Sequence, residues 1–275
     1  MKAAAFDYVR PADLSAALRH LQEGGGDAKP LAGGQSLGPM LNLRLARPKL
    51  LVDISRLGEL RGIEDGGDHW RIGAAVTHAE LEDAVGRLAG AELVPQVASG
   101  IAYRSVRNRG TIGGSLAHAD PAGDWPLALA ALDAAVVIAG GKGERRVPAD
   151  KFMKAAFTTA LGDDEAVVAI LVPKLSNTRR LGYYKFCRKT GEFPEASACA
   201  VFDPERRLAR VFLGAVHGAP IPIPAIARAV AEGGRSTMTR EAALSAVGAI
   251  QNFDEPERRM RAAVLLRALQ QAYPA

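Results

Sequence analysis

Two glycine-rich segments contain the residue types and spacing that could bind phosphate groups. The first is Ala32, Gly33, Gly34, Gln35 and Ser36, and the second is Thr111, Ile112, Gly113, Gly114 and Ser115. Each places paired glycines and a hydroxyl residue after an apolar segment, and we expect both to form turns. Because glycine has no Cβ, backbone N–H groups can converge there on one point, and a serine hydroxyl adds a donor. Two such turns could hold the two phosphates of one dinucleotide.

Neither segment matches a common nucleotide-binding fingerprint. The Rossmann pattern requires a glycine two residues after its first glycine, where this chain has Gln35 and Ser115. A P-loop requires Lys after its second glycine, and Pro39 stands at that position. A single segment of this kind is more typical of an ordinary turn between a strand and a helix, and spacing alone does not show that the two segments meet.

The composition is that of a globular chain that can bury a core. The 275 residues are 48% apolar and 24% charged, which predicts one large domain or two to three small ones. The net charge of +5 is spread along the chain and does not indicate a nucleic-acid surface. Cys187 and Cys199 are too few and too far apart for a disulfide framework, a zinc finger or an iron–sulfur site built from this chain alone.

Apolar periodicity predicts the elements that must position the glycine segments. Asp13 is expected to cap a helix that ends at the glycines 24–26, and Thr77 with Glu80 forms a capping-box pattern. Further helices are expected at 37–43, 93–99 and 127–132, and strands at 50–54, 70–73, 134–138 and 166–172. A glycine-rich, charged stretch at 58–67 and Pro173 mark two boundaries.

The last hundred residues have a different pattern. Strands are expected at 181–188, 197–202 and 208–213, and helices at 240–250 and 257–272, which predicts a separate α+β module. No apolar run approaches the roughly 18 to 20 residues that a bilayer span needs, and no signal peptide is recognisable. We therefore expect a cytoplasmic protein without a membrane span.

The two glycine segments lie within longer stretches, 31–48 and 107–126, that closely resemble the FAD-binding medium subunit of molybdenum hydroxylases, the carbon-monoxide dehydrogenase and xanthine dehydrogenase family. The resemblance covers nearly the whole chain, including residues 6–8, 161–165, 184–186 and 258–269. It implies an α+β protein whose two-subdomain, PCMH-type FAD-binding fold spans 1–57 and 58–173. A C-terminal module at 174–275, with a three-stranded antiparallel sheet and helices, would follow.

The resemblance also implies residue roles. Both glycine segments would flank the FAD diphosphate, and Asp124 and Lys185 match residues near the flavin. A lysine there would stabilise the anionic reduced flavin. From the residues alone, Asp124 could instead begin a helix and Lys185 could be solvated on a strand. The family often has Asn where Ser115 stands.

Other polar residues near these segments have two interpretations each. Arg107 and Arg109 could reach a phosphate or lie in a solvated turn. Strand alternation would point only one of Tyr183 and Tyr184 inward, and His118 and Asp120, without a third ligand nearby, are typical of loop structure. No catalytic residue and no metal ligand is therefore predicted in this chain.

The resemblance implies an electron-transfer subunit of an oxidoreductase. FAD in this chain would accept electrons from the [2Fe–2S] clusters of a small subunit, while a large subunit would hold the molybdenum cofactor, in a dimer of heterotrimers. Two alternatives are a self-sufficient FAD oxidoreductase, for which no base stands out, and a nonenzymatic FAD-binding scaffold. Nothing in the sequence specifies the substrate or the electron acceptor.

Overall fold

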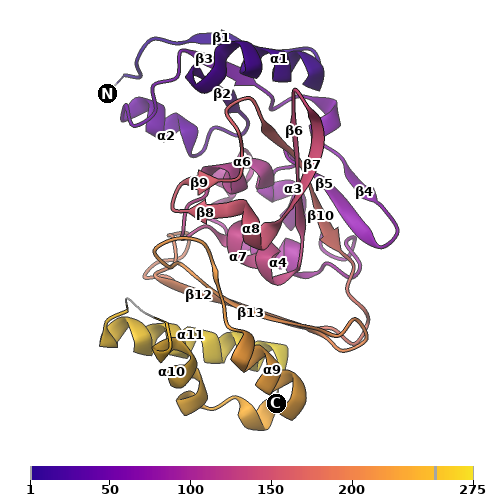
Figure 1. Cartoon of the computed structure of the whole chain (residues 1–275), viewed down its shortest axis with the longest axis vertical. Helices are drawn as coiled ribbons and strands as arrows, with labels where there is room; N and C mark the ends of the chain where they lie inside the picture. Colours follow the sequence, from indigo (N-terminus) through magenta and orange to yellow (C-terminus); the bar gives the residue numbers. More distant parts are fainter. Residues whose placement is uncertain (1, 251–252, 275) are drawn as a thin grey trace.

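The computed structural model describes residues 2–250 and 253–274, and three main sheets follow one another along the chain (Figure 1). The first sheet is parallel and has the order β1-β3-β2. Its strands and the helices around it are β1 (Asp7–Val9), α1 (Leu14–Gly24), η1 (Gly25–Asp27), β2 (Ala28–Leu31), α2 (Leu37–Asn42) and β3 (Leu50–Asp53). Asp13 caps α1, because its carboxylate accepts a hydrogen bond from the N–H of Ala16 at 2.7 Å.

The second sheet is antiparallel and has the order β4-β5-β10-β6-β7. Its strands are β4 (Ile63–Asp65), β5 (His69–Gly73), β6 (Ala135–Gly140), β7 (Gly143–Pro148) and β10 (Ala166–Pro173). The central strand β10 is buried along its whole length except at its last residue. The strands β8 (Met153–Ala155) and β9 (Thr158–Thr159) form a separate pair.

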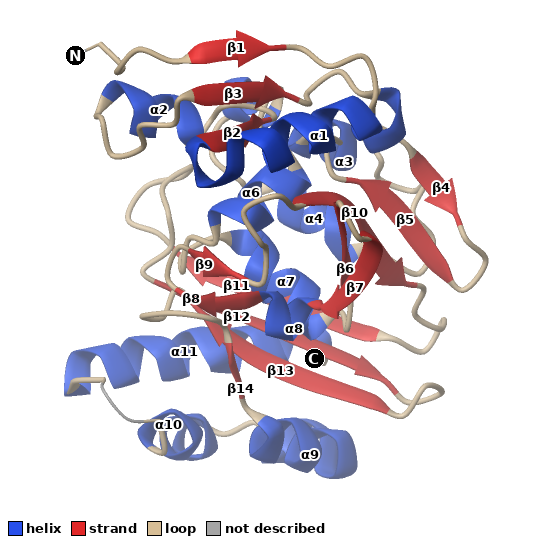
Figure 2. Ribbon diagram, turned by 45° about the horizontal axis from the view of Figure 1, so that its top comes forward, coloured by secondary structure: helices blue, strands red, loops and turns tan. Residues whose placement is uncertain are grey.

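Short helices occupy the connections of this second unit. They are η2 (Gly58–Leu60), α3 (His78–Glu82), α4 (Leu93–Ser99), α5 (Arg104–Arg107), α6 (Ile112–His118), α7 (Asp124–Ala131) and α8 (Ala149–Phe152). All eight residues of α7 are buried, so this helix runs through the interior of the molecule. It lies between the second and third sheets in both views (Figures 1 and 2).

The third sheet is antiparallel, with the order β11-β12-β13-β14. Its strands and the helices that follow are β11 (Arg180–Phe186), β12 (Ala196–Asp203), β13 (Leu208–Gly214), β14 (Ile221–Pro222), α9 (Pro224–Gly233), η3 (Gly234–Thr237), α10 (Arg240–Gly248) and α11 (Glu255–Ala272). The helices cover the face that is turned away from α7 (Figure 2). Every residue of β12 is buried, because side chains on both of its faces are covered.

The interior consists of three apolar cores. One lies between α1 and the second sheet and includes Leu21, Val52 and Val168. The next surrounds α7 and continues into the third sheet through Tyr183 and Cys199. The last fills the space between the third sheet and α9, α10 and α11. The third sheet is therefore packed on both faces.

Most predicted elements are present, and the differences have physical reasons. The predicted strands at 50–54, 70–73, 134–138 and 166–172, and the helix at 93–99, correspond to β3, β5, β6, β10 and α4. Pro173, the predicted second boundary, is the last residue of β10, where it pairs with His69 of β5. In the C-terminal module, a two-residue fourth strand, β14, pairs with the last of the three predicted strands. A helix that was not predicted, α9, precedes the two predicted helices.

Candidate cofactor site

The first glycine segment is a tight connection between β2 and α2, as predicted. Gly34 has a φ of +71°, a left-handed conformation that residues with a side chain rarely adopt. Gly33 lies so close to the chain before the second segment that a Cβ at position 33 would be 1.9 Å from the carbonyl oxygen of Arg109. Glycine is therefore required at position 33 and strongly favoured at position 34. Around them, Ala32 and Ser36 are half-buried and Gln35 is exposed.

The backbone N–H groups of this first segment are free to bind a ligand. Among the described residues, no protein acceptor receives a backbone hydrogen bond from residues 33–36. Several adjacent N–H groups with no protein partner form the donor set that a phosphate or diphosphate binds. The segment therefore fits the diphosphate of FAD.

The second segment differs from its prediction, because it is the first turn of helix α6 and not a turn after a strand. Thr111 is buried and caps α6 by accepting a hydrogen bond from Gly114 N–H at 3.1 Å. The N–H groups of Ile112 and Gly113 donate to the carbonyls of Val76 and Ala74, and that of Ser115 donates to Thr111. All four N–H groups after Thr111 are thus used within the protein.

The glycines of the second segment instead allow close packing. A Cβ at Gly113 would lie 2.5 Å from the Cβ of Ala74, and one at Gly114 would lie 2.8 Å from the hydroxyl of Thr111. The same position on Gly114 is 3.9 Å from the Cβ of Ala32. The structure therefore brings the two glycine segments together, which spacing alone did not show.

Asp124 and Lys185 form a buried ion pair. The Lys185 ammonium lies 2.8 Å from the Asp124 carboxylate, and their side chains are 16% and 7% exposed. Lys185 also donates to the carbonyl of Gly100 at 2.9 Å. The hydroxyl of Tyr183 donates to the same carboxylate oxygen of Asp124, and burial together with that carboxylate raises the pKa of Tyr183 well above its usual value.

This arrangement resolves several alternatives. Asp124 is the first residue of α7, as the helix-start interpretation predicted, and it also pairs with Lys185. Tyr183 is buried on the face of β11 toward α7, whereas Tyr184 lies on the other face, half-buried against the C-terminal core and beneath the guanidinium of Arg267. The hydrogen bond from Tyr183 to Asp124 links residues 59 positions apart, and no sequence signal indicated it.

Of the remaining polar candidates, Arg109 lies beside the first glycine segment, whereas Arg107 makes an ion pair away from it. Arg107 is paired with Glu82 at 2.8 Å, whereas Arg109 is exposed and its side chain extends toward the carbonyl of Gly33. His118 and Asp120 are 3.9 Å apart, and residues 2–250 and 253–274 contain no group of three or more side chains arranged to hold a metal ion. None of the helices within these residues is both long and apolar enough to cross a membrane.

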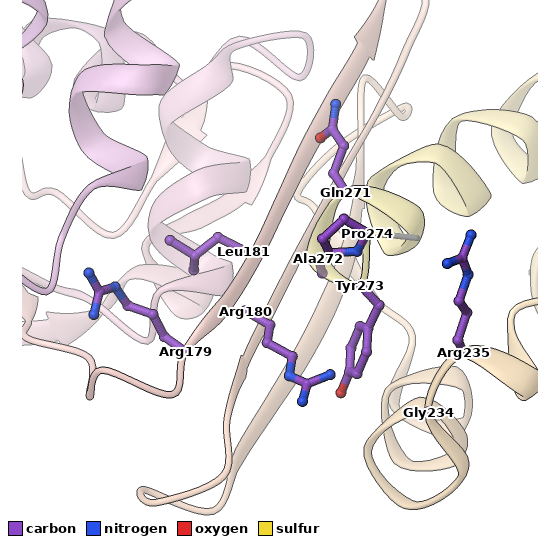
Figure 3. A pocket seen from close by; sticks show the side chains of 9 residues that line it. All are labelled: Arg179, Arg180, Leu181, Gly234, Arg235, Gln271, Ala272, Tyr273 and Pro274. Atoms are coloured by element: carbon purple, nitrogen blue, oxygen red, sulfur yellow. The ribbon is translucent and has the colours of Figure 1, made fainter.

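A hollow of about 680 Å³ opens at the C-terminal module and includes none of the predicted site residues. The guanidinium of Arg180 lies 4.2 Å from the ring centre of Tyr273 there, as the close-up shows (Figure 3). Its lining consists of Arg179, Arg180, Leu181, Gly234, Arg235, Gln271, Ala272, Tyr273 and Pro274. We therefore place the candidate cofactor site at the glycine segments and not at this hollow.

Residues 4–175 match the family model described as the FAD binding domain in molybdopterin dehydrogenase, which is well over half of the chain. The chain belongs to this family. Residues from both glycine segments, and Asp124, lie within the matched range, whereas Lys185 lies beyond it. The curated relatives of this FAD-binding family extend the likeness into the C-terminal module.

Two curated relatives and one solved structure show how far this similarity extends along the chain. The chain is 37% identical to the carbon monoxide dehydrogenase medium chain of Hydrogenophaga pseudoflava, over 93% of this chain and 89% of the relative. It is 38% identical to the 6-hydroxypseudooxynicotine dehydrogenase complex subunit alpha of Paenarthrobacter nicotinovorans, over 79% and 74%. A structure of carbon monoxide dehydrogenase from Hydrogenophaga pseudoflava, which lacks the Mo-pyranopterin moiety of the molybdenum cofactor, matches with a TM-score of 0.90 and 34% identity over 99% of both chains.

These likenesses confirm the predicted family, the α+β fold with its FAD-binding unit, and the class of FAD-dependent oxidoreductase subunit. The roles of the individual residues at the glycine segments, and the boundaries at residues 57 and 173, stay predictions.

Proposed function

We propose that this chain is the FAD-carrying electron-transfer subunit of a heterotrimeric molybdenum hydroxylase. It accepts electrons from the [2Fe–2S] clusters of a small partner subunit and passes them to an external acceptor. The observation that carries the proposal is the set of backbone N–H groups at residues 33–36 with no protein acceptor, placed beside a second glycine segment. The family assignment supports FAD as the ligand of this set.

The two glycine segments have different tasks in this proposal. The first binds the FAD diphosphate through the N–H groups of Gly33, Gly34, Gln35 and Ser36. The N–H groups of the second are used within the protein, and it holds the first in place together with the residue pair before it, through the close approach of Gly33 to the backbone of Arg109 and of Gly114 to Ala32. Near the flavin end, two of the three Lys185 N–H donors are used by Asp124 and Gly100, so one is left for the cofactor. When bound, FAD supplies a carrier that can exchange electrons singly or as a pair.

The proposal includes two partner subunits, because this chain has only Cys187 and Cys199 and cannot build a cluster by itself. The small partner contains the [2Fe–2S] clusters, and the large partner contains the molybdenum cofactor and oxidises the substrate. We propose a dimer of heterotrimers in the cytoplasm. The support is the likeness to chains named as a carbon monoxide dehydrogenase medium chain and as a subunit of a dehydrogenase complex.

A titration with FAD, with FMN as control, tests the cofactor assignment. Gly34→Ala places a side chain on a backbone with φ of +71° inside the first segment, and Gly67→Ala does the same at +87° where a Cβ meets no atom within 4 Å. We expect the wild-type chain and Gly67→Ala to prefer FAD over FMN, and Gly34→Ala to bind FAD about tenfold or more weakly, the factor that 1.4 kcal/mol represents. Equal FAD affinity of the two variants would contradict the assignment of the first segment.

Reduction kinetics test the electron-transfer role. FAD in this chain should be reduced by the substrate of the complex only when the cluster-containing subunit is present. Reduction by a substrate of the isolated chain would favour a self-sufficient flavin oxidoreductase. FAD binding without any reduction in the assembled complex would favour a scaffold.

A further inference from the structure

His78 lies at the junction between the two parts of the candidate site. It is the first residue of α3, and only 5% of its surface is exposed. The indole N–H of Trp125, the neighbour of Asp124 on α7, donates to Nδ1 of His78 at 3.2 Å. Because an indole N–H can only donate, Nδ1 must be the unprotonated nitrogen, and the ring proton is on Nε2.

The other edge of the imidazole faces the chain that leads into the second glycine segment. A Cβ at Gly110 would lie 3.0 Å from both Cδ2 and Nε2 of His78, so a side chain at position 110 would press on the ring and displace it slightly. The backbone N–H of His78 donates to the carbonyl of Gly110 at 2.9 Å. Gly110 directly precedes Thr111, which caps α6. The histidine thus contacts the start of α6 with its backbone and the start of α7 with its ring.

The ring is uncharged at neutral pH, as this contact requires. Burial and the nearby Arg107 guanidinium lower the pKa of His78 to about 4. A protonated ring would have N–H groups at both nitrogens and would lose the hydrogen bond from Trp125.

We propose that His78 is a positioning residue, which sets the placement of the second glycine segment relative to Asp124 and thereby the affinity for the cofactor. The inference rests on the proposed FAD site. His78 contacts Trp125 and Gly110, and its effect on the cofactor passes through these two residues. The hydrogen bond from Trp125 fixes the position of α7 relative to the second glycine segment. A side chain of similar size without an acceptor does not replace this hydrogen bond.

Three variants of the full chain, purified with any subunits that co-purify, distinguish a positioning role of His78 from a general loss of fold stability. His78→Asn keeps an acceptor at the position of Nδ1, and His78→Leu removes it. Val230→Ala opens space in a fully buried position of α9, in the core that belongs to the C-terminal module, and serves as the stability control. The readouts are the FAD dissociation constant, the Tm, and the Trp125 emission in a Trp70→Phe background, since the chain has two tryptophans.

We expect His78→Leu to raise the FAD dissociation constant about tenfold, the factor expected for one lost hydrogen bond of 1.4 kcal/mol, and to shift the Trp125 emission to shorter wavelength. His78→Asn should stay within about threefold of wild type, or about 0.7 kcal/mol. Val230→Ala should lower the Tm and leave the affinity unchanged. Should His78→Leu fail to fold, Gly110→Ala displaces the His78 ring from its Nε2 edge, and through this displacement it should also weaken FAD binding.

Three results would overturn the inference. The first is an FAD affinity in His78→Leu equal to that of the wild type. The second is an equal loss of FAD affinity in His78→Asn and His78→Leu. The third is a loss of FAD affinity in Val230→Ala as large as that in His78→Leu. The proposed function fails separately, because a wild-type chain that binds no FAD overturns both proposals, whereas wild-type affinity in His78→Leu overturns this one alone.

Discussion

The Asp124–Lys185 pair is held inside the protein, and removing one partner should cost more than losing a surface ion pair. Lys185→Met leaves a carboxylate that is 7% exposed, and Tyr183 is then its one side-chain donor among the residues that the structure describes, so we expect the free energy of unfolding to fall by about 3 kcal/mol. Adding Asp124→Asn should recover about 1 kcal/mol or more of this loss. Urea denaturation of the two single variants and the double variant measures the coupling.

A surface ion pair provides the control for this double-mutant cycle. Lys49 lies 2.6 Å from Asp27, but both side chains are mostly exposed. Lys49→Met should therefore leave the denaturation midpoint unchanged, because solvent screens exposed pairs. Strictly additive effects at Asp124 and Lys185 would show that their short distance contributes no net coupling.

His78 should make the protein less stable in acid. Its pKa is lowered to about 4 in the fold by burial and by Arg107, while in the unfolded chain it titrates near 6.5. As the pH falls from 6.5 to 4, the unfolded chain binds more protons than the folded chain, so this residue's contribution to stability falls. The free energy of unfolding should fall by about 3 kcal/mol, because each unit of difference between the folded and unfolded pKa of His78 represents about 1.36 kcal/mol.

The variant His78→Asn isolates this contribution from the carboxylates that also titrate in acid. It has no group that titrates at this position. Between pH 7 and pH 4, the free energy of unfolding of the wild type should therefore fall by about 3 kcal/mol more than that of the variant. Urea denaturation at both pH values measures the gap. A gap that does not change with pH would mean that His78 titrates normally in the folded protein.

At the scale of elements, the attachment of α11 to the third sheet depends on one glycine. A Cβ at Gly182 of β11 would lie 1.8 Å from the carbonyl oxygen of Ala268 on α11, so the helix backbone rests directly on the strand. Gly182→Ala should therefore push α11 away and lower the free energy of unfolding by about 2 kcal/mol or more. Gly218→Ala, where a Cβ meets no atom within 4 Å, should change it by less than about 0.5 kcal/mol. Equal thermal stability of the two variants would contradict this close packing.

The elements that were predictable are those with local signals. The Asp13 cap, the Thr77–Glu80 capping box and the apolar run of β10 each specify their structure within a few residues. Helix α6 was not predictable, because two glycines in its first turn disfavour a helix by about 1 kcal/mol each. Its hydrogen bonds to residues 74 and 76 overcome that preference, and they join segments far apart in sequence.

The candidate site divides in the same way. Both glycine segments were candidates from their residue types alone, whereas Asp124 and Lys185 became candidates only through the family resemblance. The contact of Gly33 with Arg109, the hydrogen bond from Tyr183 to Asp124 and the buried position of His78 were not identified from the sequence. These features depend on which strands and helices pack together, and no residue spacing encodes that packing.

At the scale of the whole molecule, the FAD-binding unit and the C-terminal module share a core. Trp125 and Leu127 of α7 belong to the same apolar cluster as Tyr183, Cys199 and Phe212 of the third sheet. Two units that share a buried core should unfold together. The full chain should therefore show one thermal transition, with the same midpoint by far-UV circular dichroism and by tryptophan fluorescence.

A chain cut after residue 175, at the end of the family match, tests this coupling directly. The cut removes the third sheet and leaves the buried face of α7 without its cover, so we expect the fragment to bind a hydrophobic dye, to associate, and to lose the Asp124–Lys185 pair. The proposed boundary at residue 173 would then separate two sequence regions but not two independently stable domains. A monomeric fragment that keeps a sharp transition would show that the FAD-binding unit is stable without the third sheet.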